Sequence, residues 1–487
     1  MDHETTKDSN TLNRCLMCGI AGITDSSGVS LSLYFALYAL QHRGQESAGI
    51  STWHDCSILK HKGHGLVSEV FKGDTLDFLK GKVGIGHVRY PTTGENRLEN
   101  FQPFNFTFQG HSISIAHNGN LINMQELREK YERKGQFFTS TTDTEIIAKV
   151  IIDEIREGGE VVDAVRICMR TLQGSYSVIF FIDGILYAFR DPLGIKPLCF
   201  GRTRNGVVIA SESVAIDALE GVMERDINPG ELIEARGDTV ISVQIAKSDR
   251  HAHCIFEYIY FARADSVIDK ALVYDIRRKI GEQLYREMPV IADSVSPVPD
   301  SGTAYALGLS DASDIPFVEC LMKNRYMGRT FIMPTQSKRE KAVRMKLNPI
   351  KYHLIGRSVV LVDDSIVRGT TSRRIIEMMH DAGASAIHMR IGSPPIIAPC
   401  YLGVDMPTRE ELIANKKDVE GVRETITAES LHYISLKALV EIIGEPEDHL
   451  CNGCLTGCYP ISIPSEQSSL RCIDFLDGSY QSLLPID

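Results

Sequence analysis

A cysteine near the start of the chain is the first residue whose type and surroundings could carry a reaction. Cys18 follows Met17 and begins an apolar run over residues 18–22. A buried cysteine usually acts as a small hydrophobic side chain. If Cys18 were the mature N-terminus, its α-amine, with a reference pKa of about 7.7–8.0, could act as the base that activates the thiol. Cys18 is therefore either a core residue or a nucleophile.

Polar blocks that could serve amide hydrolysis follow Cys18 in order. A nucleophile that attacks a carboxamide needs donors for the developing oxyanion and charged groups that hold an amino-acid substrate. The chain supplies an Asn-Gly pair, an arginine and an aspartate, within residues 40–49, 86–94, 117–120, 143–145 and 174–177. Taken singly, the arginine is explained as well by a surface salt bridge, the aspartate by a helix cap and the Asn-Gly pair by a turn.

Taken together, these blocks resemble the glutamine amidotransferase domain of the N-terminal-nucleophile hydrolases, from residue 18 to about residue 240. The resemblance implies that the Cys18 thiol attacks the glutamine carboxamide, releases ammonia and leaves a thioester that water clears. It implies an oxyanion hole formed by the side-chain amide of Asn118 and the backbone N–H of Gly119. It also implies that Arg89 holds the glutamine α-carboxylate and that Asp143 holds its α-ammonium group.

Two features complicate this resemblance. Lys196 stands where the family more often has arginine, and a lysine cannot form the bidentate pair with a carboxylate. Residues 1–17 also precede Cys18, which can use its α-amine only once they are gone. Either this leader is a propeptide that is removed, as in some members of the family, or Met17 is the translation start and only a methionine is trimmed. The leader lacks the apolar stretch of a signal peptide.

A second stretch with defined chemistry covers residues 359–372. An apolar run ends in Asp363 and Asp364, and a loop containing Arg368 and Gly369 then leads to hydroxyl side chains that open a helix. Loop amides at a helix N-terminus, together with hydroxyls, form an anion site suited to a phosphate monoester. Adjacent carboxylates can bind ribose hydroxyls and help to place Mg²⁺. The alternative is a capped helix that follows a strand with two surface acids.

This stretch resembles the phosphoribosyl-pyrophosphate loop of type I phosphoribosyltransferases. The resemblance implies that Ser301 joins Asp363 and Asp364 around one Mg²⁺ per subunit. Residues 323–346 are dense in cations, which predicts either a solvated surface or a basic lid that closes over pyrophosphate. The residues expected to bind phosphoribosyl pyrophosphate are Lys323, Arg325, Asp363, Asp364, Arg368, Gly369, Thr370 and Thr371.

Four cysteines form a third group of candidate residues. Cys451 and Cys454 make a C-x-x-C pair, which could belong to a zinc site, a redox pair or an iron–sulfur site. The surroundings of Cys254 and Cys400 resemble the cluster-bearing branch of the phosphoribosyl amidotransferases. That resemblance implies one [4Fe–4S] cluster per subunit on Cys254, Cys400, Cys451 and Cys454. Structural zinc, plain thiols, and Cys458 in place of one ligand stay open as alternatives.

The periodicity of the chain changes between its two halves. Strand-like runs at 113–116, 177–181 and 186–189, with helix-like stretches near 30–41 and 143–156, predict an α+β domain in an αββα sandwich. A helix at 271–288, a strand at 358–362 and a helix near 371–382 predict an α/β domain with a parallel sheet. We therefore expect a leader (1–17), a glutaminase domain (18–250), a phosphoribosyltransferase domain with the cluster ligands (251–465) and a C-terminal tail (466–487).

Composition restricts the class of protein. Of 487 residues, 52 are Lys or Arg and 63 are Asp or Glu, and the net charge of −11 argues against a nucleic-acid or anionic-membrane binder. The sequence contains no run of about 18 apolar residues that would suggest a membrane span. Twelve cysteines without an export signal favour thiol or metal chemistry over a disulfide scaffold. We expect a cytoplasmic enzyme.

A glutaminase-like half followed by a phosphoribosyl half predicts that ammonia from glutamine displaces pyrophosphate at C1 of the ribose. The chain from Cys18 to about residue 460 resembles the amidophosphoribosyltransferase family. This resemblance implies formation of 5-phosphoribosylamine in the first committed step of purine synthesis, a homo-oligomer, and inhibition by purine nucleotides. One alternative is another amidotransferase, such as one that makes a hexosamine phosphate, which has no use for residues 363–371. The other is a non-catalytic, nucleotide-binding or iron-sensing paralogue.

Overall fold

Two antiparallel sheets stack face to face in the first half of the chain. The computed structural model describes residues 17–90, 97–324, 347–406 and 408–464. The seven-stranded sheet has the order β11-β9-β10-β1-β4-β2-β3, with bounds β1 (Gly19–Thr24), β2 (Ser47–His54), β3 (Ser57–His64), β4 (Val83–Arg89), β9 (Cys199–Arg202), β10 (Val207–Ala210) and β11 (Val222–Asp226). The six-stranded sheet has the order β13-β12-β8-β7-β6-β5, with bounds β5 (Phe104–Phe108), β6 (His111–Leu121), β7 (Gly174–Ile182), β8 (Ile185–Arg190), β12 (Glu231–Arg236) and β13 (Thr239–Gln244).

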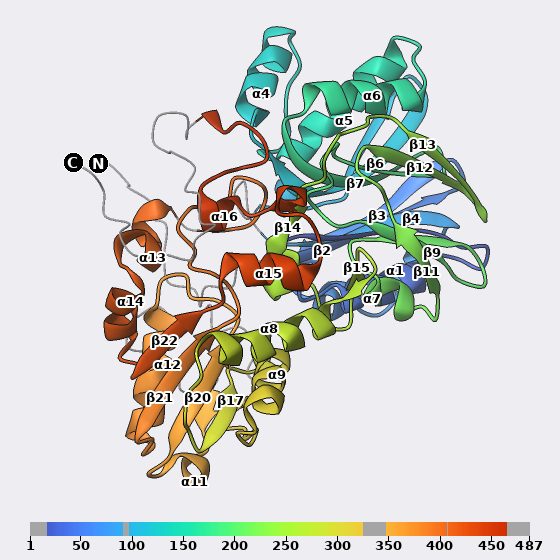
Figure 1. Ribbon diagram of the computed structural model, residues 1–487. Coiled ribbons are helices and arrows are strands. Elements are labelled where there is room, and N and C mark those ends of the chain that lie inside the picture. The colour runs from blue at the N-terminus through green and yellow to red at the C-terminus, as the bar shows by residue number, and fades with distance from the viewer. Residues whose placement is uncertain (1–16, 91–96, 325–346, 407, 465–487) are drawn as a thin grey trace, which may run out of the picture.

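The sheets pack through alternate apolar side chains. Ile20 of β1 and Ile179 of β7 belong to the core between them. Gly22 allows the close approach, because a Cβ there would lie 2.6 Å from a methyl group of Ile179. Helices α1 (Ser30–Ala39) and α7 (Val214–Asp217) cover the outer face of the first sheet, and α4 (Met124–Arg133), α5 (Asp143–Arg156) and α6 (Val161–Thr171) cover that of the second. The predicted αββα sandwich is confirmed (Figure 1).

A four-stranded parallel sheet forms the centre of the second half, also as predicted. Its order is β17 (Ser294–Pro297), β20 (Ser358–Asp363), β21 (Ala386–Ile391) and β22 (Ser430–Tyr433). Val360 and Val362 of β20 point to one face and Val359 and Leu361 to the other, as the period of two requires. Helices α8 (Val273–Glu287) and α9 (Thr303–Ser313) cover the first face, and α12 (Thr370–Asp381) and α14 (Val419–Ile426) cover the second.

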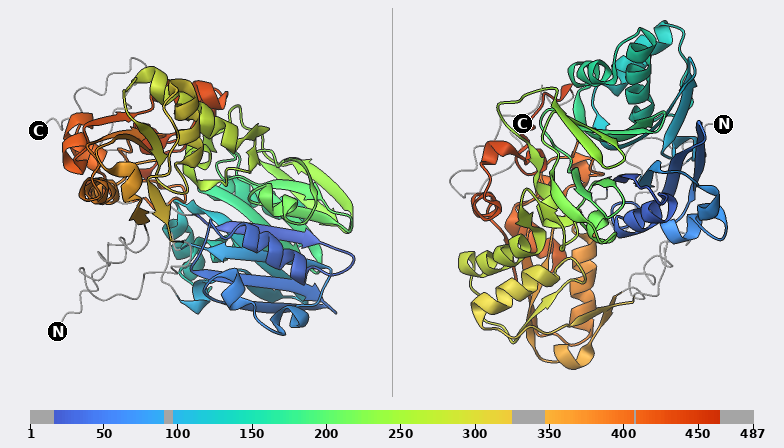
Figure 2. Two further views of the ribbon diagram at one scale, coloured as in Figure 1. Left: turned by 90° about the horizontal axis from the view of Figure 1, so that it is seen from below. Right: turned by 90° about the vertical axis from the view of Figure 1, so that its right-hand side faces the viewer.

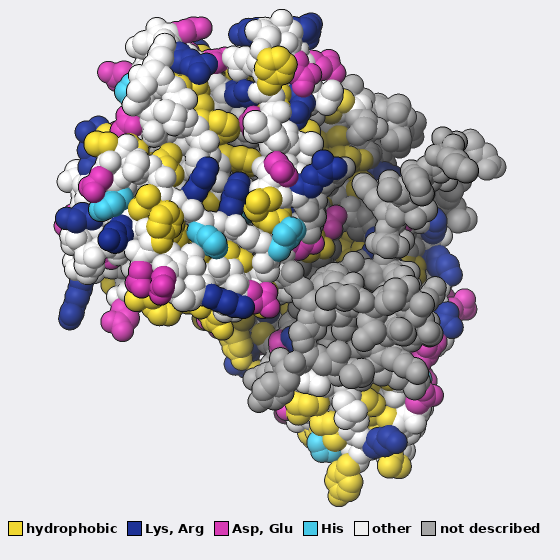
Figure 3. Space-filling model, turned by 180° about the vertical axis from the view of Figure 1, so that it is seen from behind, with side chains coloured by type: hydrophobic (Ala, Val, Ile, Leu, Met, Phe, Trp, Pro, Cys, Tyr) yellow, Lys and Arg dark blue, Asp and Glu magenta, His cyan; other side chains and the backbone are white. Residues whose placement is uncertain are grey.

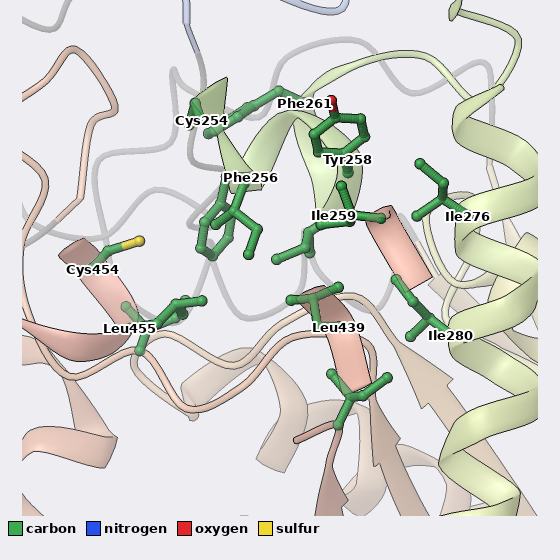
Figure 4. Close-up of a cluster of buried hydrophobic side chains, with 14 of the residues drawn as sticks. Cys254, Phe256, Tyr258, Ile259, Phe261, Ile276, Ile280, Leu439, Cys454 and Leu455 are labelled. Carbon is green, nitrogen blue, oxygen red and sulfur yellow. The ribbon is translucent and has the colours of Figure 1, made fainter. Parts of the chain in front are cut away.

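The two halves lie side by side (Figure 2) and share a buried apolar cluster, which we call the interface core. Met17 and Ile195 of the first half belong to it, together with residues 254–262, α8, α15 (Leu436–Ile443) and α16 (Gly453–Thr456). Figure 4 shows part of this core, with Cys254 and Cys454 near Phe256 and Leu455. A short parallel pair, β14 (His253–Cys254) and β23 (Leu450–Cys451), joins the domain boundary to the C-terminal segment.

The surface agrees with the mixed charge of the sequence. On the face seen in Figure 3, positively and negatively charged side chains are interspersed. Among the residues that the structure describes, no helix is both long and apolar enough to cross a membrane.

Candidate active site

Cys18 lies at the start of β1, next to the end of β4. Its thiol contacts the carbonyl oxygen of Tyr90 at 3.6 Å, and Arg43 Nε donates to the Cys18 carbonyl at 3.0 Å. Burial raises the pKa of the Cys18 thiol, while the nearby Arg89 charge lowers it and Asp143 raises it. The structure therefore places both expected glutamine-binding residues close enough to the expected nucleophile for their charges to act on its thiol.

The expected oxyanion donors lie on β6. Asn118 is buried, and its Nδ2 has no hydrogen-bond partner among the described residues. A buried amide donor without a partner costs about 1–3 kcal/mol unless a ligand accepts from it. Gly119 has a φ of +153°, and a Cβ there would lie 2.0 Å from the Ser175 carbonyl oxygen. The strand therefore presents a free side-chain donor beside a position that only glycine can occupy.

Asp143 is the first residue of α5 and is fixed against β6. Its Oδ2 accepts from the Leu121 N–H at 3.0 Å, and its Oδ1 lies 3.4 Å from His117 Nδ1. The aspartate is therefore held beside the strand that carries Asn118, although one of its oxygens already has a backbone partner. Arg89, at the end of β4, is also buried.

A buried ion cluster next to Cys18 was missed in the sequence. Arg43, which holds the Cys18 carbonyl, donates to Glu212 at 2.5 Å and to Glu257 at 2.7 Å. Burial alone would lower the pKa of Arg43, but Glu257 and Glu212 together raise it. Arg43 lies within the recognised block 40–49, yet nothing in that block identified Glu257, which lies in the second half of the chain.

Lys196, the departure from the family's pattern, is buried at the interface core. Its Nζ donates to the thioether sulfur of Met17 at 2.9 Å. Met17 itself is fully buried in that core. The residue directly before the expected nucleophile is therefore packed between the two halves.

The second group of candidate residues lines one pocket that opens to solvent. The strand β20 ends at Asp363, and Gly369, with a φ of +74°, turns the chain into α12 at Thr370. Of the residues expected here, those that line the pocket are Ser301, Lys323, Asp363, Asp364, Arg368, Gly369, Thr370 and Thr371. Arg325 and most of the basic segment lie outside the described residues.

The charged groups of this pocket already make local contacts. Asp363 Oδ1 accepts from the Asp364 N–H at 2.9 Å, and Asp364 Oδ1 accepts from the Ser365 hydroxyl at 2.6 Å. Lys323 Nζ lies 2.5 Å from Asp300. The two acids are therefore oriented by the loop itself, at the opening of a helix N-terminus, where a phosphate is stabilised by backbone N–H groups.

None of the four expected cluster ligands is in a disulfide, and all four lie near the interface core. Cys254 and Cys451 are direct partners across the β14–β23 pair. Burial raises the pKa of Cys254 to about 11, and the charge of Cys400 adds to it. Cys458 differs, because it is disulfide-bonded. Over the described part of the chain, no group of three or more His, Cys, Asp or Glu side chains is arranged as a metal site.

Comparisons with known proteins agree with this geometry. Residues 94–218 match the model of a family described as a glutamine amidotransferase domain. An amidophosphoribosyltransferase of Methanothermobacter thermautotrophicus is 52% identical over 466 residues, which cover 96% of this chain and 98% of the relative. The protein of the same name from Archaeoglobus fulgidus is 50% identical, over 93% of this chain and 99% of its own.

A solved structure has the same architecture over most of its length. The glutamine phosphoribosylpyrophosphate amidotransferase of B. subtilis, solved with ADP and GMP, superimposes with a TM-score of 0.86 at 40% sequence identity. The match covers 92% of this chain and 98% of that one.

Proposed function

The chain belongs to the amidophosphoribosyltransferase family, and we propose that the two sites described above carry out the two halves of its reaction. The enzyme is a glutamine-dependent amidotransferase of purine biosynthesis. It converts phosphoribosyl pyrophosphate, glutamine and water to 5-phosphoribosylamine, pyrophosphate and glutamate. The full-length relatives give no support to a non-catalytic paralogue.

The first half-reaction takes place at Cys18. Once Cys18 is N-terminal, its α-amine takes the thiol proton and the sulfur attacks the glutamine carboxamide carbon. The tetrahedral oxyanion accepts hydrogen bonds from Asn118 Nδ2 and the Gly119 N–H, ammonia leaves, and water hydrolyses the thioester to glutamate. The observation that carries this assignment is the buried Asn118 Nδ2, which has no hydrogen-bond partner within the described part of the chain.

Glutamine is held by its two charged groups. Arg89 pairs with the α-carboxylate and Asp143 with the α-ammonium, because both are buried side chains of the complementary charge that act on the Cys18 thiol. A free amino acid is therefore preferred over a glutamine within a peptide, which lacks both charges.

The second half-reaction takes place in the pocket at the end of β20. The loop 368–371 and the N-terminus of α12 bind the 5-phosphate, while Asp363 and Asp364 bind the ribose hydroxyls. Ser301, Asp363 and Asp364 would hold Mg²⁺, which when bound offsets charge on the pyrophosphate leaving group. Ammonia attacks C1 as the bond from C1 to the pyrophosphate oxygen breaks.

The route for ammonia between the two sites follows the interface core. Arg43, which donates to the Cys18 carbonyl, is bonded to Glu257 of the 254–262 segment in that core, and Tyr260, which packs against the core, lines the pocket at β20. Apolar walls exclude water and keep ammonia from being protonated and lost.

A [4Fe–4S] cluster on Cys254, Cys400, Cys451 and Cys454 is proposed as a structural element. Its support is the chemistry of the donor set: four cysteines outside disulfides, from three separate segments near one core. Thiolates of this kind are the usual ligands of iron–sulfur clusters. The reaction transfers no electrons, so we assign the cluster no step in it.

Maturation and regulation complete the proposal. Active enzyme begins at Cys18, whether residues 1–17 are a propeptide or Met17 is the start. A full-length precursor that appears by mass and then shortens to begin at Cys18 would identify the leader as a propeptide. The phosphate-binding pocket would also accept a purine nucleotide as an inhibitor, in line with the ADP and GMP of the B. subtilis structure. A homo-oligomer is proposed from family membership.

The division of labour is tested with Cys18→Ala. We expect loss of pyrophosphate release with glutamine but full phosphoribosylamine formation from a high concentration of ammonia, because carbon–nitrogen bond formation takes place in the other pocket. As a matched control, Asp364→Asn should lower both activities together. A folded Cys18→Ala variant that lost both activities would contradict the assignment.

A further inference from the structure

A short segment of the second half lies directly on the strands that carry the oxyanion hole. Asn120 Nδ2 donates to the Tyr401 carbonyl at 2.8 Å, and the Ser175 hydroxyl donates to the Leu402 carbonyl at 2.8 Å. Asn120 and Ser175 face each other across β6 and β7. Two neighbouring side chains of the first half therefore hold two successive carbonyls of residues 401–403, which we call the 401–403 segment.

The third residue of this segment touches the oxyanion hole itself. Gly403 has a φ of +91°, and a Cβ there would lie 2.9 Å from the carbonyl carbon of Gly119 and 3.1 Å from its oxygen. Gly119 also lies so close to Ser175 that a Cβ on Gly119 would approach the Ser175 carbonyl oxygen to 2.0 Å. Gly119 is therefore in close contact with both β7 and the 401–403 segment.

The 401–403 segment is also held by contacts within the second half. The Leu402 N–H donates to Cys400 Sγ at 3.3 Å, and the ring of Tyr401 packs edge-on against that of Tyr459, with centroids 5.3 Å apart. Leu402 and Ser175 are buried, so water cannot readily replace their contact. The segment is thus a fixed support rather than a surface loop that rests on the strands.

We propose that the 401–403 segment is a positioning element for the oxyanion hole, an inference that rests on the proposed role of Asn118 and Gly119. An oxyanion donor stabilises the transition state only if its N–H points at the position of the oxyanion. The direction of the Gly119 N–H is set by its backbone, which Gly403 contacts closely. The glutaminase site is therefore completed by residues that lie about 280 positions further along the chain. No residue of the segment needs to touch glutamine.

The variant Gly403→Ala tests this role, because its new methyl group presses on Gly119. We expect kcat with glutamine to fall about 100-fold, as a displacement of about 1 Å can do, while KM for glutamine stays within about twofold. Activity with ammonia should also stay within about twofold. Gly444→Ala is the matched control: its φ is +83° and a Cβ there meets nothing within 4 Å. It should leave both activities unchanged.

A second measurement tests the oxyanion hole by ligand binding, without turnover. The aldehyde analogue of glutamine forms a tetrahedral adduct with the Cys18 thiol, whereas the product glutamate binds without one. Gly403→Ala and Asn120→Asp, which keeps the side-chain shape but cannot donate, should weaken binding of the aldehyde about tenfold or more and leave glutamate binding within about twofold. If the segment only held the two halves together, the variants would weaken the binding of both ligands or of neither.

Asn118→Ala separates failure of this inference from failure of the proposed function. If Asn118→Ala keeps full activity with glutamine, the oxyanion hole itself is wrongly assigned. If Asn118→Ala loses that activity while folded Gly403→Ala and Asn120→Asp keep it, the positioning role is overturned. Parallel loss of the glutamine and ammonia activities in Gly403→Ala would overturn it as well.

Discussion

The Glu212 carboxylate lies in a fully buried site between His42 and Arg43. Its Oε1 lies 2.7 Å from His42 and 2.5 Å from Arg43. Burial alone would raise the pKa of Glu212, but His42 and Arg43 lower it well below its usual range. A carboxyl whose folded pKa is lowered stabilises the fold above its unfolded pKa, about 4.3 for glutamate, and this contribution is lost as the pH falls below that value.

We therefore expect Glu212→Gln to lower the free energy of unfolding by about 3–5 kcal/mol at pH 7, because it leaves Arg43 buried with one partner fewer. The difference from the wild type should shrink between pH 5 and pH 3, at about the pH where the unfolded glutamate takes up its proton. Denaturant unfolding across this range measures both effects. Glu220→Gln, at an exposed glutamate, is the control. If it lowered the free energy of unfolding equally, the buried ion cluster could not be the cause.

At the scale of residues, the sequence predicts the side chains that belong to short motifs with a defined chemical role. Cys18, Asn118 and Asp143 belong to short blocks whose order carries information. The structure brings Cys18 and Asp143 together, and Asp143 contacts the strand that carries Asn118. Glu257 could not be found in this way, because a buried charge becomes meaningful only through a partner, and its partner Arg43 lies 214 positions away. Gly403 was missed for the same reason: its neighbour Gly119 is distant in sequence.

The loop between β20 and α12 makes a prediction at the scale of elements. Gly369 has a φ of +74°, and a Cβ there would lie 2.7 Å from a methyl group of Ile413. Gly369→Ala should distort the loop, raise KM for phosphoribosyl pyrophosphate about tenfold or more, and lower the glutamine and ammonia activities in the same proportion. Steady-state kinetics with both nitrogen donors measures this.

Gly356→Ala provides the control for this prediction. Gly356 has a φ of +69°, but a Cβ there meets nothing within 4 Å and the residue is outside the pocket. Both variants bear a backbone cost of about 1–3 kcal/mol for a non-glycine residue in the left-handed region. A similar rise in KM in Gly356→Ala would show that lost stability, not loop shape, is responsible.

The long periodic elements were the predictable ones. The helices expected at 30–41, 143–156, 271–288 and 371–382 occur as α1, α5, α8 and α12, with ends that differ by at most two residues. The pairing of β14 with β23 could not be predicted, because strands of two residues have no period to read. Yet this pair is what places Cys254 beside Cys451.

The proposed cluster makes a prediction about the whole molecule. Protein purified without oxygen should be brown and contain about four iron atoms per chain. Binding free energy at such a site is also folding free energy, so exposure to air should release iron, lower the melting temperature and reduce the glutamine and ammonia activities together. Iron analysis and thermal unfolding measure this independently of activity.

Two variants locate the cluster. Cys454→Ser should lose iron and melt at a lower temperature, whereas Cys56→Ser, at an exposed cysteine outside the set, should retain both iron and stability. One zinc per chain without acid-labile sulfide would contradict the assignment, and iron retained after replacement of both Cys451 and Cys454 by serine would move the site elsewhere.

At this largest scale, the sequence predicted two architectures but not how they meet. The alternation of helices and strands in the second half predicts the parallel sheet, and the many strand-like runs of the first half predict the sandwich. Each half could therefore be predicted from its own pattern. Contacts between the halves involve buried charges and backbone carbonyls, as at Arg43 and Glu257 or at Asn120 and Tyr401. Such contacts follow no periodicity and depend on the finished fold.

The docking of the 401–403 segment on β6 and β7 also bears on how the protein is made. Synthesis proceeds from the N-terminus at roughly 5–20 residues per second, so Tyr401 leaves the ribosome roughly 15–55 s after Asn120. During that interval the nascent sandwich has its nucleophile but not the support for its oxyanion hole. With the positioning role proposed above, an unfinished chain hydrolyses glutamine far more slowly until it contains the half that can use the ammonia.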